Sequence, residues 1–136
     1  MGRIKQSQIT YWCHEIIRSQ AEAGGCYIDA TMGKGNDTLF LCELAGENGK
    51  VLAFDIQQEA LDATRELLRT HGKEQQAKLI LDGHEHMDRY AMEESTDVIC
   101  FNFGYLPGGD HKLATTYQTS IEAIGKGLGI LKHGGM

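Results

Sequence analysis

The chain has 136 residues, of which 41% are hydrophobic and 24% charged, and its formal net charge is -6 at pH 7. This length suits one domain with a core of ordinary size, and the composition is that of a soluble globular protein rather than a disordered one. The acidic balance argues against a broadly basic nucleic-acid-binding surface, although a local basic patch or residues outside this sequence could still contact RNA.

The sequence shows no sign of membrane insertion or of a disulfide framework. No apolar segment approaches the roughly 18 residues that a membrane-spanning helix needs, and the N-terminus lacks the apolar core of a signal peptide. The cysteines are scattered and form no C-x-x-C pair, which favours a reducing compartment and argues against zinc. We therefore expect a cytoplasmic protein without a membrane partner.

The first predicted helix runs from Ser7 to about Ala23 and stops at a pair of glycines. Its apolar residues recur at helical spacing; they are Ile9, Trp12, Ile16 and Ile17. A helix before the first strand normally covers one face of the sheet, so we expect Trp12 in the core. Stacking of the Trp12 ring on a ligand is the alternative.

Residues 26–38 read as a short apolar strand that ends at Asp29, a loop containing Gly33 and Gly35, and the first turn of a helix that continues to about residue 46. Glycines accept positive φ and let the backbone approach a ligand, and a helix N-terminus presents unpaired N–H groups. The stretch predicts a site for a polar, nucleotide-like cofactor. A simple tight turn is the alternative, because Thr38 occupies the third glycine position of the dinucleotide fingerprint G-x-G-x-x-G.

A second buried strand, residues 51–55, ends in an acid, Asp55, which lies 20 residues beyond Gly35. An acid at the end of the second strand can accept hydrogen bonds from both hydroxyls of a ribose. Its alternative role is to cap the following helix, Gln57 to about Thr70. The spacing between the loop and the acid favours the ribose role.

A third strand is predicted over residues 77–81 and is followed by the cluster His84, Glu85, His86. Adjacent residues in one loop rarely converge on one ion, so we expect no metal. We expect the turn at residues 82–84 to border the base of the cofactor, and a short helix to follow over about residues 87–92.

The fourth predicted strand, residues 97–103, runs into a loop at 102–111 that contains Pro107, the only proline of the chain. Open α/β sheets place their chemistry at this end of a strand. A helix capped by Thr115 or Thr116 then continues to about Leu131. The glycines that follow indicate another strand.

Alternating strands and helices predict a right-handed, parallel α/β sheet in the order 3-2-1-4, with helices on both faces. We expect residues 1–136 to form a single domain that is incomplete at its C-terminus, truncated after the fourth strand and its helix. In such a fragment the fourth strand would be an unpaired edge.

Several motifs together resemble a known family. They are Asp-Ala-Thr-Met-Gly-x-Gly at 29–35, Ala-Phe-Asp-Ile-Gln at 53–57 and Gly-Tyr-Leu-Pro-Gly-Gly-Asp at 104–110. The chain is similar to class I S-adenosylmethionine-dependent methyltransferases, which have a Rossmann-like sheet, and most similar to the MnmM family. The resemblance implies N-methylation of the 5-aminomethyl group of the wobble uridine, usually a 2-thiouridine, in transfer RNA.

The resemblance also implies S-adenosylmethionine as the cofactor, the tRNA anticodon region as the partner, and a homodimer. The residues expected to bind the cofactor are Asp29, Thr31, Gly33, Gly35, Asn36, Asp37, Thr38, Asp55, Gln57, His84 and Asn102. The expected catalytic residues are Asn102, Tyr105 and Asp110. Asn102 would accept a hydrogen bond from the amine, Tyr105 would stack on the base, and Asp110 would accept a proton or bind the ammonium.

Other functions stay open on these residues. An N-methyltransferase acting on ribosomal RNA or on a small amine would use the same cofactor site. A nicotinamide-dependent oxidoreductase shares the loop and the acid but lacks the third glycine. A non-catalytic module that binds S-adenosylmethionine is the alternative from a different functional class.

Overall fold

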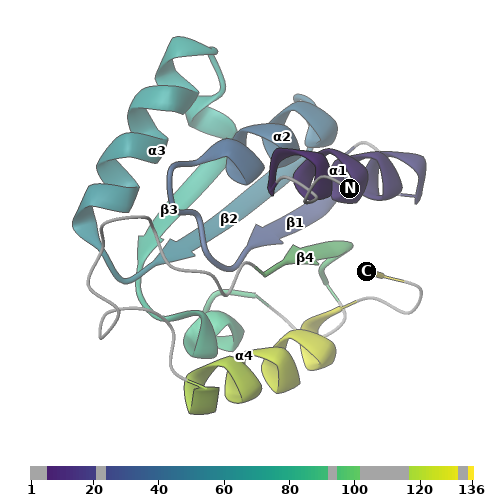
Figure 1. Ribbon diagram of the computed structural model, residues 1–136, viewed down its shortest axis with the longest axis vertical. Coiled ribbons are helices and arrows are strands. Elements are labelled where there is room, and N and C mark those ends of the chain that lie inside the picture. Colours follow the sequence, from purple (N-terminus) through teal and green to yellow (C-terminus); the bar gives the residue numbers. More distant parts are fainter. Residues whose placement is uncertain (1–5, 21–23, 92–94, 102–116, 132–134) are drawn as a thin grey trace, which may run out of the picture.

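The computed structural model describes residues 6–20, 24–91, 95–101, 117–131 and 135–136. These ranges contain one parallel sheet in the order β3-β2-β1-β4 (Figure 1). Its strands are β1 (Cys26–Asp29), β2 (Lys50–Asp55), β3 (Ala77–Leu81) and β4 (Val98–Cys100). The order and the parallel pairing confirm the predicted topology.

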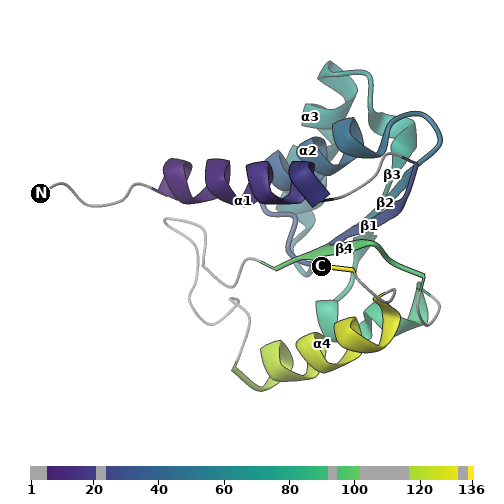
Figure 2. The same ribbon diagram turned by 90° about the vertical axis from the view of Figure 1, so that its right-hand side faces the viewer.

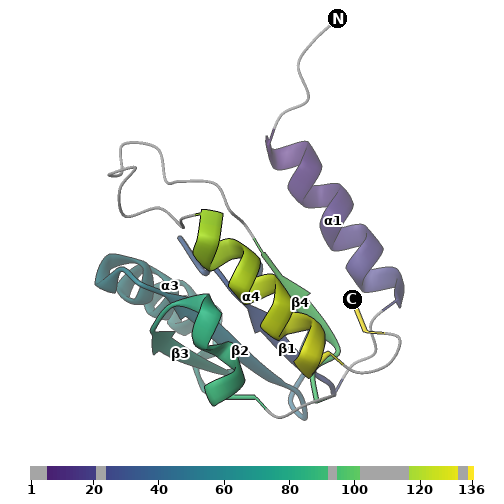
Figure 3. The same ribbon diagram turned by 90° about the horizontal axis from the view of Figure 1, so that it is seen from below.

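Helices cover both faces of this sheet (Figure 2). One layer contains α1 (Gln6–Gln20), α2 (Asn36–Ala45) and α3 (Gln58–Thr70). The opposite layer contains the 3-10 helix η2 (His84–Arg89) and α4 (Tyr117–Ile130), which lie side by side (Figure 3). A 3-10 turn, η1 (Glu74–Gln76), leads into β3. No helix in the described part of the chain is long and apolar enough to cross a membrane.

Successive side chains along each strand point to opposite faces of the sheet, which gives the core two layers. Tyr27 of β1 is in register with Val51 and Val98, and all three belong to the cluster that contacts α1, α2 and α3. Ile28 and Phe54 belong to the opposite cluster, which includes side chains of η2 and α4. Each fully buried side chain of this size contributes about 1.5–3 kcal/mol. The sheet is therefore buried on both faces, as parallel sheets require.

The predicted boundaries of some elements differ from the structure. The short helix predicted at 87–92 begins earlier, at His84, because the His86 amide donates to the Gly83 carbonyl directly after β3. Strand β4 ends at Cys100, because Phe101 is not part of the strand. Residues 102–103, which were also predicted to belong to it, lie outside the described part of the chain.

The expectation that Trp12 lies in the core is wrong, because its side chain is 53% exposed. Helix α1 packs through a neighbouring face, on which Ile17 is buried and His14 reaches Asp37 of α2. Trp12 and Ile16 lie one turn apart and are both exposed. The apolar spacing therefore predicted the helix correctly but not its buried face.

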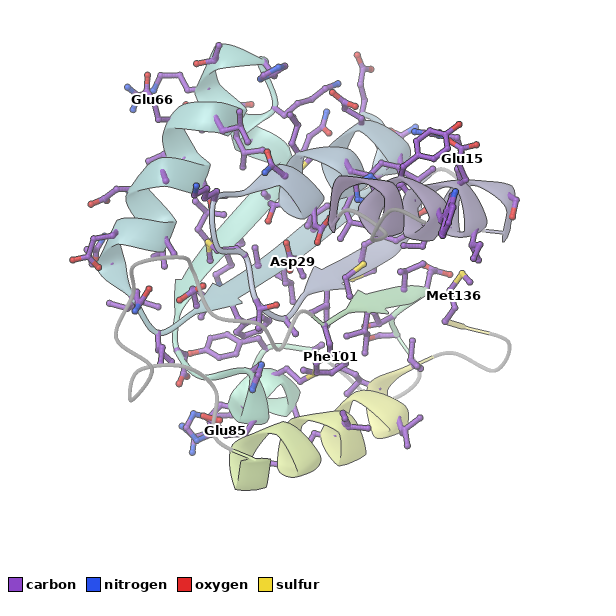
Figure 4. All side chains as sticks on the ribbon, in the orientation of Figure 1. Glu15, Asp29, Glu66, Glu85, Phe101 and Met136 are labelled. Carbon is purple, nitrogen blue, oxygen red and sulfur yellow. The ribbon has the colours of Figure 1, made fainter. Side chains whose placement is uncertain are left out.

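A further strand position lies beside β4. Met136 donates its amide hydrogen to the Asp97 carbonyl and accepts a hydrogen bond from the Ile99 amide, at 2.9 and 2.7 Å. This is the pattern of a parallel ladder. Met136 thus lies where the sequence predicts another strand after the glycines, and it pairs with the edge of β4 (Figure 4).

Helix α3 packs directly on the backbone of the glycine loop. Gly35 has a φ of 92°, and a Cβ there would lie 2.9 Å from the Thr64 Cα. The Thr64 hydroxyl also donates to the Gly33 carbonyl at 3.4 Å. The absence of a side chain at Gly35 therefore makes room for α3 rather than for a ligand.

We expect Gly35→Ala to lower the free energy of unfolding by about 3 kcal/mol, because it adds a backbone collision to the strain of a positive φ. Gly72→Ala is the matched control, since Gly72 has a φ of 68° but no neighbour within 4 Å of the added Cβ. That variant should lose only about 1 kcal/mol. Urea denaturation of both variants measures the difference, and equal losses would contradict the packing argument.

Candidate cofactor site

The candidate site lies at the edge of the sheet where the parallel strands end. Asp29 ends β1, Asp55 ends β2, and Asp82 directly follows β3. Phe101 follows β4, and Figure 4 labels it together with Asp29. The carboxyl ends of parallel strands are where open α/β sheets bind ligands. The fold therefore brings the predicted loop and the predicted ribose acid to one place.

Asp55 links the glycine loop to the start of α3. Its Oδ2 accepts a hydrogen bond from the Gly33 amide at 3.1 Å, and its Oδ1 accepts one from the Gln57 amide at 3.0 Å. Gln57 is the N-cap residue of α3, so Asp55 also satisfies a backbone donor at this helix end. A carboxylate oxygen can accept a second hydrogen bond. The half-buried Asp55 carboxylate thus keeps acceptor capacity for ligand hydroxyls.

Asp29 shapes the loop from inside the protein. Its Oδ2 accepts a hydrogen bond from the Thr38 hydroxyl at 2.7 Å, and its Oδ1 accepts one from the Thr31 amide at 3.1 Å. Asp29 and Thr38 are 1% and 0% exposed. Burial raises the pKa of Asp29 from 3.8 to about 8. Asp29 and Thr38 therefore fix the path of the chain from β1 into α2.

Backbone hydrogen bonds fasten the same loop to both neighbouring strands. The Met32 amide donates to the Phe54 carbonyl of β2 at 2.9 Å, and the Ala30 amide donates to the Cys100 carbonyl of β4 at 2.8 Å. Gly33 and Gly35 both have the positive φ that the sequence predicts. The loop is thus held on two sides before any ligand binds.

Helix α2 begins at this loop. Its N-cap residue is Gly35, which has no side chain to cap the first turn. Asn36 is exposed, whereas the half-buried Asp37 bonds to His14 of α1 at 2.7 Å. Orphan amides at a helix N-terminus attract anions. The first turn of α2 is therefore suited to an anionic group.

The turn after β3 forms a polar network. Asp82 Oδ1 accepts hydrogen bonds from the Gly83 amide at 2.7 Å and from His86 Nδ1 at 2.6 Å, while Oδ2 accepts one from the Tyr90 hydroxyl at 2.9 Å. The His86 hydrogen bond is the main cause that lowers the pKa of Asp82. This network fixes the turn that is predicted to border the base of the cofactor.

His84 and His86 have different surroundings. His84 is 5% exposed and its ring lies 6.0 Å from that of Phe101, and burial lowers its pKa, so the imidazole is neutral at neutral pH. His86 instead bonds Asp82. Among the described residues, no three or more His, Cys, Asp or Glu side chains are grouped to hold a metal.

The described residues leave part of the predicted site unplaced. Asn102, Tyr105 and Asp110 lie outside the described ranges. His14 was missed by the sequence analysis, because it lies 23 residues from Asp37 in sequence and no motif includes it. Thr64 was missed for the same reason, since its packing on Gly35 depends on the tertiary structure.

Comparisons with known proteins agree with this geometry. Residues 51–136 match a family described as "Putative rRNA methylase". The chain belongs to this family. A protein from Arabidopsis thaliana, named as a chloroplastic tRNA (mnm(5)s(2)U34)-methyltransferase, is 34% identical over 99% of this chain and 52% of its own length. The chain thus spans about half of that relative.

Solved structures of similar proteins share the fold. A protein from Clostridium thermocellum described as a "putative rRNA-methylase" superposes with a TM-score of 0.89 at 40% identity, covering 98% of this chain and 70% of that one. A protein from Streptococcus mutans described as a "putative methyltransferase", in complex with S-adenosylhomocysteine, has a TM-score of 0.83 at 38% identity, with the same coverage. The predicted family and the class I methyltransferase fold are confirmed.

The protonation of Asp29 predicts a pH dependence of stability. Above about pH 4 the unfolded chain releases the Asp29 proton, whereas the folded protein keeps it. The free energy of unfolding therefore falls as the pH rises from about 4 toward about 8. Asp29→Asn keeps a hydrogen-bond acceptor but does not titrate. Between about pH 5 and pH 8, the stability of the wild type relative to Asp29→Asn should fall by more than about 1 kcal/mol. Chemical denaturation measures it, and a constant difference would contradict the buried protonated carboxyl.

Proposed function

We propose that the full-length protein is an S-adenosylmethionine-dependent methyltransferase that methylates the 5-aminomethyl group of wobble uridine, or its 2-thio form, in tRNA. The product is 5-methylaminomethyl-(2-thio)uridine. The observation that carries this proposal is the match to the Arabidopsis tRNA methyltransferase across 99% of this chain. The junction of the glycine loop with Asp55 supports it, because it offers the polar contacts that an adenosyl cofactor needs.

The described residues fit this cofactor. The Asp55 oxygens, each with one hydrogen bond to an amide, have capacity for the ribose hydroxyls. The first turn of α2 suits the carboxylate of the methionine part. The turn after β3, with His84 beneath it, would border the adenine. The S-adenosylhomocysteine in the Streptococcus mutans relative supports this assignment.

Residue roles in the reaction follow from the chemistry of an amine nucleophile. The cofactor supplies an electrophilic methyl group, so the protein mainly positions the amine and disfavours its protonation. The Asn102 side-chain carbonyl would accept a hydrogen bond from the neutral amine, and Tyr105 would stack on the uracil. Asp110 would receive the proton that the amine releases or bind the ammonium before transfer.

Ribosomal RNA is the second candidate substrate. The family description and the Clostridium thermocellum relative both name an rRNA methylase. Incubation of the full-length protein with labelled donor and either purified tRNA or ribosomal RNA separates the two. We expect label in tRNA only.

We also propose the tRNA anticodon region as the contact site, a homodimer as the assembly and the cytoplasm as the location. The anticodon region follows from the wobble position of the substrate. The acidic composition of the chain limits any basic RNA-binding surface to a local patch or to residues beyond this sequence.

We expect Asp55→Asn to raise the dissociation constant for S-adenosylmethionine at least about ten-fold, because the loss of the charge weakens the hydrogen bonds to the ribose. Asp62→Asn is the matched control, since Asp62 is exposed on α3 and bonds Gln58. Isothermal titration calorimetry measures both variants. Equal affinities in the two variants would remove Asp55 from the cofactor site.

Methyl transfer to tRNA tests the reaction itself. Mass spectrometry of nucleosides from tRNA that carries 5-aminomethyl-2-thiouridine should show conversion to the methylated form by the full-length protein. Asn102→Ala should mainly lower kcat, by about 100-fold, because the amine loses its hydrogen-bond acceptor. An unchanged kcat would remove Asn102 from the catalytic residues, and tRNA left unmodified by the wild type would contradict the proposed reaction.

A further inference from the structure

Helix α1 contacts the start of α2 through two side chains one turn apart, His14 and Arg18. His14 Nε2 lies 2.7 Å from Asp37 Oδ1. The His14 ring also stacks on the Phe40 ring, with centroids 3.8 Å apart and an interplanar angle of 1°. The Arg18 guanidinium lies 5.3 Å from the centroid of the same Phe40 ring. Figure 1 shows α1 beside α2 on the same face of the sheet.

The His14–Asp37 contact is partly shielded from water. The two side chains are 19% and 28% exposed, and Phe40 is 7% exposed. Nε2 must carry a hydrogen to bond a carboxylate, so His14 donates and Asp37 accepts. Hydrogen bonds to a charged acceptor are the stronger class, and partial burial reduces their screening. The contact therefore restrains Asp37 toward α1.

Asp37 lies in the first turn of α2, immediately after the glycine loop. Its neighbour Thr38 is bonded to the buried Asp29 on the other side of the chain. The first turn is thus held from the core by Asp29 and from α1 by His14. The backbone amides of this turn are the groups that we propose bind the carboxylate of the methyl donor.

We propose that His14 is a positioning residue of the methyl-donor site. Its N–H group holds the Asp37 carboxylate and its ring covers Phe40, so the first turn of α2 keeps the orientation that the donor requires. This inference rests on the proposed function, because it assigns the restrained turn to the donor carboxylate. It adds a residue from α1 to a site otherwise built from the loops after the strands.

Two substitutions separate the two contacts of His14. His14→Phe keeps an aromatic ring that can stack on Phe40 but lacks the N–H donor, whereas His14→Gln keeps a donor without the ring. His71→Phe is the matched control, because His71 is exposed at the C-cap of α3, where its imidazole bonds the Leu67 carbonyl. All three are made in the full-length protein.

The readouts are the dissociation constant for S-adenosylhomocysteine by calorimetry and, in the free protein, amide hydrogen exchange of Leu39, whose amide donates to the Gly35 carbonyl. In His14→Phe we expect both the dissociation constant and the exchange rate to rise about ten-fold. His14→Gln should stay within about three-fold of the wild type for both, and His71→Phe should match the wild type. In methyl-transfer assays, KM for the donor should rise in His14→Phe while kcat is kept.

The outcomes distinguish this inference from the proposed function. A wild-type protein that does not bind S-adenosylhomocysteine contradicts the proposed function. If the wild type binds and His14→Phe binds equally well, the positioning role is wrong. It is also wrong if His14→Phe lowers the melting temperature without changing the affinity, because His14 would then serve stability alone.

Discussion

The hydrogen bond from the Gly33 amide to the Asp55 carboxylate, at 3.1 Å, is the contact on which the arrangement of the site depends. It joins the loop after β1 to the end of β2, and the same carboxylate accepts a hydrogen bond from the amide of Gln57, the N-cap residue of α3. One side chain thus fixes the separation between two strand ends and the direction of a helix. The carboxylate is only half-buried, and each of its oxygens can accept a further hydrogen bond. The proposed hydrogen bonds from the ribose hydroxyls would use these free acceptor positions.

Around this contact the loop and the first turn of α2 are restrained by the core, by α3 and by α1. Asp29 binds Thr38 from the core, Thr64 of α3 packs against Gly35, and His14 of α1 binds Asp37. Each contact uses a polar group or a missing Cβ rather than apolar area alone. Such a loop loses little conformational freedom when a ligand arrives, which favours binding. The loop after β1 and the first turn of α2 are thus held in place in the free protein.

The strands, their order and the position of Asp55 at the end of β2 could be predicted, because their signals are local or follow from topology. Short apolar runs ending in an acid identify β1 and β2, and alternating helices make the sheet parallel. The buried face of α1 could not be predicted, because Trp12 and Ile16 have the same helical spacing as a core stripe but are exposed. The His14–Asp37 contact depends on how two helices dock, which no local pattern encodes. The roles of residues beyond the described ranges stay predictions.

A crystal structure of the full-length protein with S-adenosylhomocysteine tests whether Asp55 and the first turn of α2 bind the methyl donor. We expect the ribose hydroxyls within hydrogen-bonding distance of the Asp55 carboxylate, and the amino-acid carboxylate at the first turn of α2. A ligand bound on another face of the sheet, or protein side chains filling the space beside Asp55, would show that these residues do not form the cofactor site.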